Sequence, residues 1–318
     1  MNNHTTILIA DSGSTKTDWA LVTSHLVPLT SHHAPRTSYL APRTSHLEKL
    51  LHTQGINPVH QDEQTIRHIL NNELKPQLDG LPVAAVYFYG SGVRPTEEPL
   101  MQRLLQETLA TSQQASMQQE VPTMAVEVEA HSDLLGAARA LCGRHEGLAC
   151  ILGTGANSCL YDGSEIVSNT PPLGYVLGDE GSGAVLGIRF LNALYKGVLP
   201  DAVRREFEDE QGLSLADVIN RVYRQPMPNR FLASLSPFIH ARRHLPALNS
   251  IVVENFRLFL QRNVNPYGRH DLPLAAVGSV AFYYQEQLAQ AAAAEGYTLG
   301  HIERTPLQGL VNYHLVTR

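Results

Sequence analysis

Residues Thr6–Val22 read TILIADSGSTKTDWALV, and this stretch decides the fold. A short apolar run ends at Asp11, a polar turn containing Gly13 follows, and the apolar run resumes at Trp19. Two β-type runs joined by a short, polar, glycine-containing turn predict a β-hairpin. We therefore expect the segment Asp11–Thr17 to lie at the tip of a hairpin.

A second stretch with the same pattern occurs about 140 residues later. The apolar run Gly147–Leu152 ends in Gly153-Thr-Gly155, and Ser158–Tyr161 returns as the second arm of the hairpin. Two such hairpins in matching contexts predict two related halves of the chain. Each half is expected to carry one glycine turn facing a common cleft.

The rest of the chain alternates between strand-like and helix-like segments, which is typical of the α/β class. Further strands are expected at Pro82–Tyr89, Thr123–Val128 and Leu272–Val277. Helices are expected at Gln61–Leu78, Glu97–Thr111, Asp133–Leu141 (with Ser132 as N-cap) and Phe282–Glu295, and the chain is predominantly helical from Gly183 to Val264.

The segment 24–51 interrupts this pattern with a tandem near-duplicate of seven residues. Ala34-Pro-Arg-Thr-Ser-Tyr-Leu40 is followed at once by Ala41-Pro-Arg-Thr-Ser-His-Leu47. A proline in each copy is incompatible with one continuous helix. We interpret the segment as a loop or an extended hairpin arm outside the core.

Composition excludes several classes of protein. The chain has 318 residues, which favours two domains, and its 43% hydrophobic content is that of a globular protein. The net charge is −6 with no cluster of Lys and Arg, so we expect no nucleic-acid partner. No apolar run is long enough to span a membrane, and an odd count of three cysteines argues against a disulfide framework. These features lead us to expect a cytoplasmic protein without a membrane partner.

The two glycine turns have the chemistry of phosphate-binding sites. Glycine allows backbone N–H groups to converge on an anion, and neighbouring hydroxyl groups add donors. Asp11 at the end of a strand suits a Mg²⁺ ion carried by a nucleotide, usually through water. The first turn lacks the spacing of a Walker loop. Taken alone, either turn could equally be an ordinary tight turn.

A third glycine, Gly278, follows a buried strand and is followed by Ser279 at the start of a helix. Such a position allows a ligand to approach the backbone closely. The full dinucleotide fingerprint is absent, so the adenosine part of a nucleotide is expected here rather than NAD.

Two acidic residues are candidates for substrate chemistry. Asp133 is expected at the start of a helix, where the helix dipole would keep it ionised and able to accept a proton. Asp179 lies between Gly178 and Gly181, where a carboxylate beside exposed backbone could bind sugar hydroxyls. The alternatives are a first-turn aspartate without catalytic role and a capping acid for a helix beginning near Ser182.

Taken together, these motifs resemble the N-acetylglucosamine kinase family of the actin–hexokinase–heat-shock superfamily. The resemblance covers nearly the whole chain in order, except residues 24–51. The matching segments are Asp11–Trp19 (first phosphate motif), Thr53–Pro58, Asp133–Arg139, Leu152–Ser158 (second phosphate motif), Leu173–Ser182 (sugar signature) and Gly278–Ala281 (adenosine motif).

The resemblance implies two actin/hexokinase-like, ribonuclease H-like domains of mixed sheet and helices that flank a nucleotide and sugar cleft. The expected domains are 1–134 plus 303–318, with the first phosphate turn, and 135–302, with the other motifs. The family also implies ATP and Mg²⁺ as cofactors, an amino sugar as substrate and a homodimer.

The resemblance also implies a role for each site residue. Asp133 would be the catalytic base that takes the proton of the sugar hydroxyl, and Asp11 would position Mg²⁺ through water. Sugar-binding residues would be Asn57, Thr154, Gly174 and Asp179. Nucleotide-binding residues would be Asp11, Gly13, Ser14, Thr15, Lys16, Thr17, Gly153, Thr154, Gly155, Gly278, Ser279 and Gly309.

The expected reaction is transfer of the γ-phosphoryl group of ATP to the 6-hydroxyl of N-acetylglucosamine. Members of the family often carry an aromatic residue where this chain has Leu173, which leaves sugar specificity open. Glucosamine, N-acetylmuramate or another hexose are alternative substrates. Alternatives from other classes are a non-enzymatic sugar or nucleotide sensor and an activator ATPase that drives electron transfer from an iron–sulfur cluster, as for 2-hydroxyacyl-CoA dehydratases and benzoyl-CoA reductases.

Overall fold

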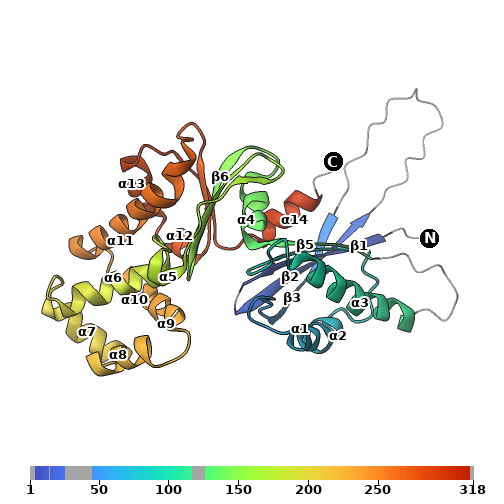
Figure 1. Ribbon diagram of the computed structural model, residues 1–318, viewed down its shortest axis with the longest axis horizontal. Helices are drawn as coiled ribbons and strands as arrows, with labels where there is room; N and C mark the ends of the chain where they lie inside the picture. Colours follow the sequence, from blue (N-terminus) through green and yellow to red (C-terminus); the bar gives the residue numbers. More distant parts are fainter. Residues whose placement is uncertain (1–3, 14, 26–44, 117–125, 316–318) are drawn as a thin grey trace. The chain divides into compact units, whose positions relative to one another are not determined.

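The computed structural model describes residues 4–13, 15–25, 45–116 and 126–315 (Figure 1). The chain forms two compact units, Met1–Gly136 with Leu307–Arg318 and Ala137–Pro306. Each unit contains one five-stranded mixed sheet with helices, so the predicted α/β class is confirmed. In the described part of the chain, no helix is both long enough and apolar enough to cross a bilayer.

The sheet of the first unit has the strand order β3-β2-β1-β4-β5. The first three strands are antiparallel neighbours, and β4 and β5 run parallel to β1. Its strands are β1 (His4–Ser12), β2 (Lys16–His25), β3 (Ser45–Gln54), β4 (Ala85–Gly90) and β5 (Glu127–Ser132). Its helical segments are α1 (Glu63–Ile69), the π-helical turn η1 (Leu70–Leu74), α2 (Lys75–Gln77), α3 (Glu98–Ser116), the start of α4 (Asp133–Cys142) and α14 (Leu307–Leu315).

The register of this sheet brings three chain segments to one edge. Ser12 pairs with Gly90, and Gly90 pairs with Ser132. Because the carboxyl ends of parallel strands meet at the same edge, the first glycine turn and the start of α4 lie there together. The side chains alternate between the two faces of the sheet. Phe88 packs in the hydrophobic core that includes residues of α1 and α3, and Tyr89 contacts Gly136 and His314 on the other face.

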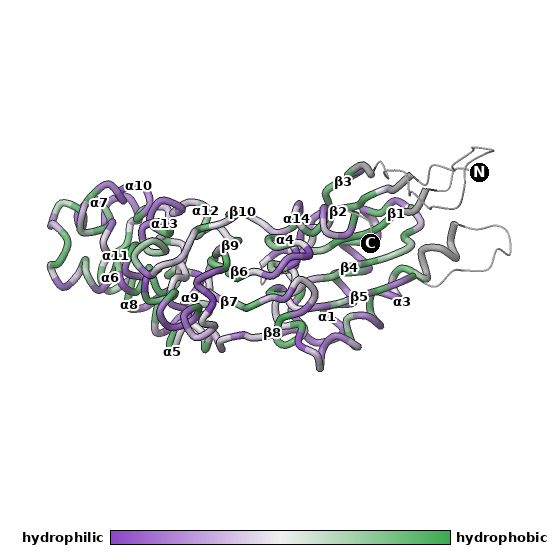
Figure 2. The backbone as a smooth tube through the Cα atoms, turned by 90° about the horizontal axis from the view of Figure 1, so that it is seen from above, coloured by the Kyte–Doolittle hydropathy of each residue, from purple (hydrophilic) through white to green (hydrophobic). Residues whose placement is uncertain are grey.

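The sheet of the second unit has the strand order β10-β9-β6-β7-β8. Here too three antiparallel strands are followed by two that are parallel to the first of them, β6. The two sheets thus have the same strand order and directions, as expected for two related halves. The apolar strands β1 and β9 appear green in Figure 2. The strands are β6 (Gly147–Leu152), β7 (Ala156–Tyr161), β8 (Ile166–Ser168), β9 (Leu274–Val277) and β10 (Leu299–Glu303).

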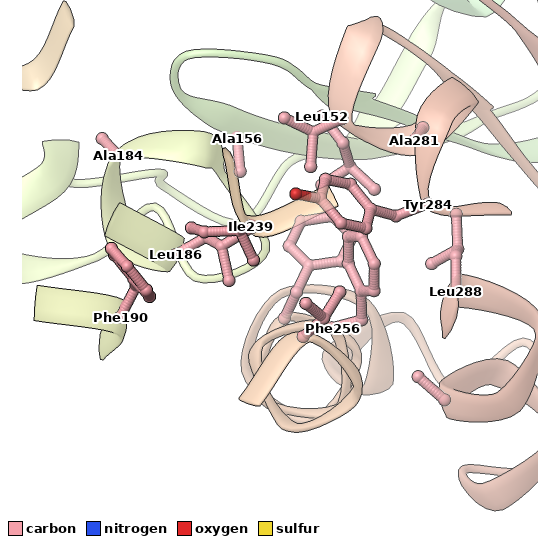
Figure 3. Packing of buried hydrophobic residues seen from close by; sticks show 14 of the residues in the cluster. Leu152, Ala156, Ala184, Leu186, Phe190, Ile239, Phe256, Ala281, Tyr284 and Leu288 are labelled. Carbon is pink, nitrogen blue, oxygen red and sulfur yellow. The ribbon is translucent and has the colours of Figure 1, made fainter. Parts of the chain in front are cut away.

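The helices of the second unit cover its sheet and form most of its core. They are α5 (Gly174–Leu177), α6 (Gly183–Tyr195), α7 (Asp201–Gln211), α8 (Leu215–Tyr223), α9 (Pro228–Ser234), α10 (Ser236–Ala241), α11 (Pro246–Phe259), the turns η2 (Leu260–Val264) and η3 (Asn265–Tyr267), α12 (Ser279–Tyr283) and α13 (Gln285–Ala294). Figure 3 shows Leu152 and Ala156, which flank the second glycine turn, in one cluster with Phe256 and Tyr284.

Both predicted hairpins are confirmed, as are the strands at Gly147–Leu152 and Leu272–Val277 within a few residues. The predicted strand Thr123–Val128 overlaps β5, which spans Glu127–Ser132, and its first three residues lie outside the described residues. The alternation of polar and apolar residues in EVEAHS is the pattern of a half-buried strand, and the prediction ended too early at Val128. The predicted helix Phe282–Glu295 is divided at Tyr284 into α12 and α13.

The segment 24–51 was expected to lie outside the core, and this expectation is wrong for its last part. Ser45–Gln54 forms β3, which pairs with β2 along nine residues and buries Leu51. As an edge strand β3 leaves Leu47 and Leu50 about half exposed, so its apolar pattern is weak. The first copy of the repeat and most of the second copy fall outside the described residues.

Candidate active site

The predicted site residues are distributed over both units, and each group is described within its own unit. In the first unit, the turn between β1 and β2 is closed by the Gly13 N–H, which donates to the Lys16 carbonyl at 3.0 Å. Gly13, Thr15 and Lys16 are exposed at the tip. A Cβ atom at Gly13 would contact only the Lys16 carbonyl oxygen, at 3.7 Å. The backbone there is open to a ligand. Ser14 lies outside the described residues.

The hydroxyl groups beneath this turn are already bonded within the protein. Ser12 and Thr17 are fully buried, and their hydroxyl oxygens lie 2.7 Å apart. Ser12 also bonds both the N–H and the carbonyl of Ile56 at 3.0 Å, and Thr17 donates to the Gln54 carbonyl. Ser12 therefore fixes the loop that carries Asn57, and Thr17 supports the turn from below.

Asp11 and Asp133 are brought together at the carboxyl edge of the first sheet. The pKa of Asp11 is raised to about 7, chiefly by burial and then by the nearby charges of Asp133 and Asp18, while Lys16 acts to lower it. Burial also raises the pKa of Asp133, although the backbone N–H groups of Leu134 and of Asp133 itself lower it. The expectation that the helix start alone would keep Asp133 ionised is therefore corrected: burial is the larger effect.

Ser132 holds the N-cap position of α4, where its hydroxyl accepts from the Leu135 N–H at 3.2 Å. The cap predicted from the sequence is thus confirmed. Asp133 is not needed for that bond. Its carboxyl group is available for another role.

Sequence reasoning missed Asp18. This buried carboxylate lies 2.7 Å from the Lys16 ammonium and 2.7 Å from the Nδ1 atom of His52. His52 comes from β3, just after the segment 24–51, and is 34 residues from Asp18 along the chain, so no local pattern could have indicated the pairing.

Asn57 is buried, and its side-chain oxygen accepts from the Val59 N–H at 3.0 Å. The side chain lies against Gly92, where a Cβ atom would be only 2.2 Å from the Asn57 Oδ1 atom. Gly92 has a φ of +80°, which favours glycine at this position. The turn after β4 is thus shaped to admit Asn57.

In the second unit, the turn between β6 and β7 is closed by the Gly153 N–H, which donates to the Gly155 carbonyl at 3.0 Å. The first two N–H groups of α6 donate to this turn, from Gly183 to Gly153 at 2.8 Å and from Ala184 to Thr154 at 3.2 Å. A Cβ atom at Gly153 would meet nothing within 4 Å. Like the first turn, this turn is held by hydrogen bonds within its own unit, and its backbone is open to a ligand at Gly153.

Asp179 lies beside the second turn. A Cβ atom at Gly155 would be 3.2 Å from the Asp179 Oδ2 atom, and the Ala156 N–H bonds the carboxylate. Burial raises the pKa of Asp179 to about 6, with a smaller contribution from Glu180. The N-cap of α6 is Ser182, whose hydroxyl accepts from the Val185 N–H. The capping alternative for Asp179 is therefore not what the structure shows.

Gly174 begins α5 with a φ of +75°, next to Leu173, whose φ is +62°. Leu173 is 64% exposed, and Val176 and Leu177 on the same short helix are 73% and 75% exposed. The sugar signature thus presents an apolar surface before Asp179. Leu173 contributes an aliphatic side chain to this surface, at the position where an aromatic residue was expected from the resemblance.

Gly278 lies directly against the second turn. Its φ is +123°, and a Cβ atom would be 2.3 Å from the Leu152 carbonyl oxygen and 3.2 Å from the Gly153 nitrogen. Ser279 follows, exposed, as the first residue of α12. The adenosine and second phosphate motifs are therefore contiguous. Gly309 lies within α14 of the first unit.

Replacing Gly278 by Ala is expected to lower the free energy of unfolding by roughly 3 kcal/mol, because this backbone conformation is almost restricted to glycine and the Cβ would clash with backbone. Gly153→Ala is the matched control: Gly153 lies in the adjoining turn, but a Cβ atom there meets nothing within 4 Å, so this variant should change stability little. Urea denaturation of both variants measures the difference. Equal stability of the two would contradict the close packing described here.

Comparison with known proteins identifies the family. No family model matches the sequence, and no match is found among curated proteins. A solved structure from Porphyromonas gingivalis, named a putative N-acetylglucosamine kinase, is 44% identical to this chain. The match covers 97% of this chain and 98% of the other, with a TM-score of 0.83. The chain belongs to the N-acetylglucosamine kinase family.

A second solved structure shares the fold with a TM-score of 0.64. It is named a putative N-acetylglucosamine kinase from Chromobacterium violaceum. It is 19% identical and covers 97% of this chain and 98% of its own. The family resemblance found in the motifs is therefore confirmed by the Porphyromonas structure, which matches 97% of the chain.

The donor set of this kinase family member fits a nucleotide-borne Mg²⁺ ion. Among the residues described, no three His, Cys, Asp or Glu side chains are grouped so that they could enclose a metal ion. Asp11 and Asp133, however, are two neighbouring carboxyl groups whose raised pKa values reflect burial without enough positive charge. A divalent cation that keeps its water and phosphate ligands would supply that charge.

Proposed function

We propose that this chain transfers the γ-phosphoryl group of ATP to the 6-hydroxyl of N-acetylglucosamine. Membership of the family makes it an ATP-dependent sugar kinase. The single observation that carries the mechanism is the placement of Asp133. Its carboxyl group begins α4 beside Asp11, is free of the capping bond made by Ser132, and has a raised pKa, as a general base requires.

In this mechanism the oxygen of the sugar hydroxyl attacks the γ-phosphorus, and Asp133 takes the proton of that hydroxyl. The bond from the γ-phosphorus to the β,γ-bridging oxygen breaks, and ADP leaves. Asn57 and Asp179, with Gly174 and Thr154 nearby, hold the sugar hydroxyls. Most of the rate enhancement comes from positioning and from neutralising charge, which suits a site built from turns.

The nucleotide contacts are proposed from the same residues that the motifs indicate. Open backbone at Gly13 and Gly153 supports contact with phosphate oxygens, as do the exposed Thr15, Lys16 and Thr154. Gly155, whose Cβ position lies against Asp179, is proposed as a further phosphate contact from the motif. Asp11 would hold Mg²⁺ through water, and the ion would neutralise charge on the phosphates. Ser14 joins the phosphate contacts, and Gly278, Ser279 and Gly309 contact adenosine. Thr17 acts as a support, because its hydroxyl is buried and bonded.

Three further proposals follow the family. The ATPase-type domains are 1–134 plus 303–318 and 135–302, close to the two compact units of the structure. The enzyme works in the cytoplasm. It assembles as a homodimer.

A panel of sugars tests the proposal. Purified protein is mixed with MgATP and one sugar at a time, and ADP release is measured with a coupled assay. N-acetylglucosamine should give the highest kcat/KM, above glucosamine, N-acetylmannosamine, N-acetylmuramate and glucose. ³¹P and ¹³C NMR of the product should show the phosphate on the 6-oxygen. A product phosphorylated elsewhere, or turnover of glucose above all others, would overturn the substrate or the position.

The described cysteines count against the activator ATPase. An iron–sulfur cluster needs thiolate ligands, so its cysteines must ionise. Cys150 and Cys159 are fully buried in β6 and β7, where burial raises the pKa of Cys150 well above its ordinary value and that of Cys159 to about 12. Burial also raises the pKa of the less buried Cys142 to about 11. These thiols behave as small apolar side chains.

The raised pKa of Asp179 predicts a pH dependence. A protonated carboxyl group loses acceptor capacity, so sugar binding should weaken as the pH falls through about 6, the pKa of this group. At saturating MgATP, kcat/KM for N-acetylglucosamine should then fall towards tenfold per pH unit below that value. In Asp179→Asn the acidic limb should lose this contribution, and KM should be raised at every pH. An unchanged acidic limb in the variant would assign the titration to another group.

A further inference from the structure

The loop that carries Asp179 has an unusual backbone and needs external support. Asp179 itself adopts a left-handed φ of +55°, which costs a residue with a side chain about 1 kcal/mol or more. Within the loop, the Asp179 N–H donates to the Pro172 carbonyl and the Ser182 N–H donates to the Asp179 carbonyl, both at 3.0 Å. These bonds close the loop but do not attach it to the core.

Asn255 supplies one attachment. This residue of α11 is fully buried, in a helix whose neighbouring Val252, Phe256 and Phe259 belong to the hydrophobic core. Its side-chain oxygen accepts from the Gly181 N–H at 3.3 Å, and its side-chain nitrogen donates to the Ser182 carbonyl at 3.2 Å. One amide thus binds two consecutive loop residues. It accepts from the Gly181 N–H and adds a second bond to the Ser182 carbonyl, which also accepts from the Leu186 N–H of α6 at 3.0 Å.

The fit of the loop on α11 is close at the same point. A Cβ atom at Gly181 would be 2.8 Å from the Phe259 Cβ atom. The loop backbone therefore rests directly on the helix surface, one helical turn beyond Asn255. An apolar residue would pack at position 255 as well as Asn does, but the Gly181 N–H would lose its bond to Asn255 and the Ser182 carbonyl would keep only the bond from Leu186, so packing alone does not explain the amide.

Glu180 supplies a second attachment from the next residue along. It is buried, and it accepts from Arg262 at 2.6 Å and from Asn263 at 3.4 Å. Burial acts to raise the pKa of Glu180, but these hydrogen bonds outweigh it and the pKa lies below its ordinary value. Asp179 and Glu180 thus have different partners: Glu180 is tied to η2, and Asp179 lies beside the Gly155 turn.

We propose that Asn255, together with the Glu180–Arg262 pair, positions Asp179 for sugar binding. Neither Asn255 nor Arg262 needs to contact substrate; both act by holding the loop Gly178–Ser182 in the one conformation that places the Asp179 carboxylate against the second turn. This inference rests on the proposed role of Asp179 as a sugar ligand. It adds positioning residues that no motif in the sequence indicates.

The test is a comparison of Michaelis constants for N-acetylglucosamine and ATP. Asn255→Leu keeps the volume but removes both loop bonds, so KM for the sugar should rise about tenfold or more while KM for ATP stays within about twofold. Arg262→Met, at a side chain that is 62% exposed, should raise the sugar KM severalfold in the same direction. Partial unfolding lowers the amount of active enzyme and hence the apparent kcat, but it leaves KM unchanged.

Gln287→Leu is the matched control. Gln287 is a buried amide of the same unit, bonded to Asn249 on α11, and it makes no bond to the loop. It should leave both KM values unchanged. The sugar KM of the double variant Asn255→Leu/Asp179→Asn should be less than about twofold above that of Asp179→Asn alone, because Asn255 acts through the Asp179 carboxylate.

The outcomes separate the inference from the function on which it rests. If Asp179→Asn raises the sugar KM and Asn255→Leu does not, the positioning role is overturned and the function stands. If wild-type protein phosphorylates none of the sugars, both are overturned. If Asn255→Leu does not fold, Arg262→Met decides: a rise confined to the sugar KM supports the inference, and unchanged or equally raised KM values overturn it.

Discussion

Replacing Asp133 by Asn is expected to lower kcat by about 100-fold or more, with much smaller changes in the KM for sugar and for ATP. The amide keeps the size and shape of the side chain but cannot take up the proton of the attacking hydroxyl. The Ser132 cap and the start of α4 remain intact, so the site keeps its geometry. Steady-state kinetics over the sugar panel measures the effect.

Asp62→Asn is a suitable control for this experiment. Asp62 is also an aspartate at a helix start in the first unit, where its side chain caps α1 through the Thr65 N–H at 2.8 Å. Its amide analogue can still cap, so kcat should not change. Near-native kcat of Asp133→Asn on every sugar would remove Asp133 as the base and with it the proposed mechanism.

Replacing Gly153 by Val is expected to raise the dissociation constant of ATP by about 100-fold, with the fold unchanged. A β-branched side chain fits the open space in front of this turn, where no protein atom lies within 4 Å, but it would occupy the volume that phosphate oxygens need. The loss of two or three phosphate hydrogen bonds, each worth about 1 kcal/mol or more, gives this magnitude. Calorimetric titration with MgATP measures it.

Gly13→Val tests the same idea in the first turn, and its thermal stability should likewise be unchanged. The reason is space rather than backbone conformation, because Gly13, Gly153 and Gly155 are not among the described residues with positive φ. Gly155→Val is the less clean variant, because its Cβ would press on Asp179. Unchanged ATP affinity in both Gly13→Val and Gly153→Val would place the phosphates elsewhere.

The sequence predicts the parts of the fold that are set by local patterns. Both hairpins are recognisable because their arms are apolar and their tips are polar and contain glycine. Strands β3 and β10 lie at sheet edges and are largely exposed, so their residues show no clear alternation. Their place in the sheets depends on partners far along the chain, which no local pattern contains.

The candidate site follows the same division. Motifs indicate Asp11, Asp133 and Asp179, but the burial that raises their pKa values is a property of packing. The supporting residues were not predictable, because each reaches across the sequence. His52 is 34 residues from Asp18, and Asn255 is 74 residues from Gly181. Only the folded chain brings such pairs within hydrogen-bond distance.

The last helix, α14, has a consequence for how the protein is made. It packs on β1 and β2, and the Tyr89 hydroxyl lies 2.8 Å from the His314 Nε2 atom. The ribosome releases this helix only after Ala137–Pro306, a delay of roughly 10–30 s at typical elongation rates. During this time the face of the first sheet that α14 covers in the folded protein remains exposed. The second unit, which is one uninterrupted stretch, can finish folding first, although its synthesis begins later.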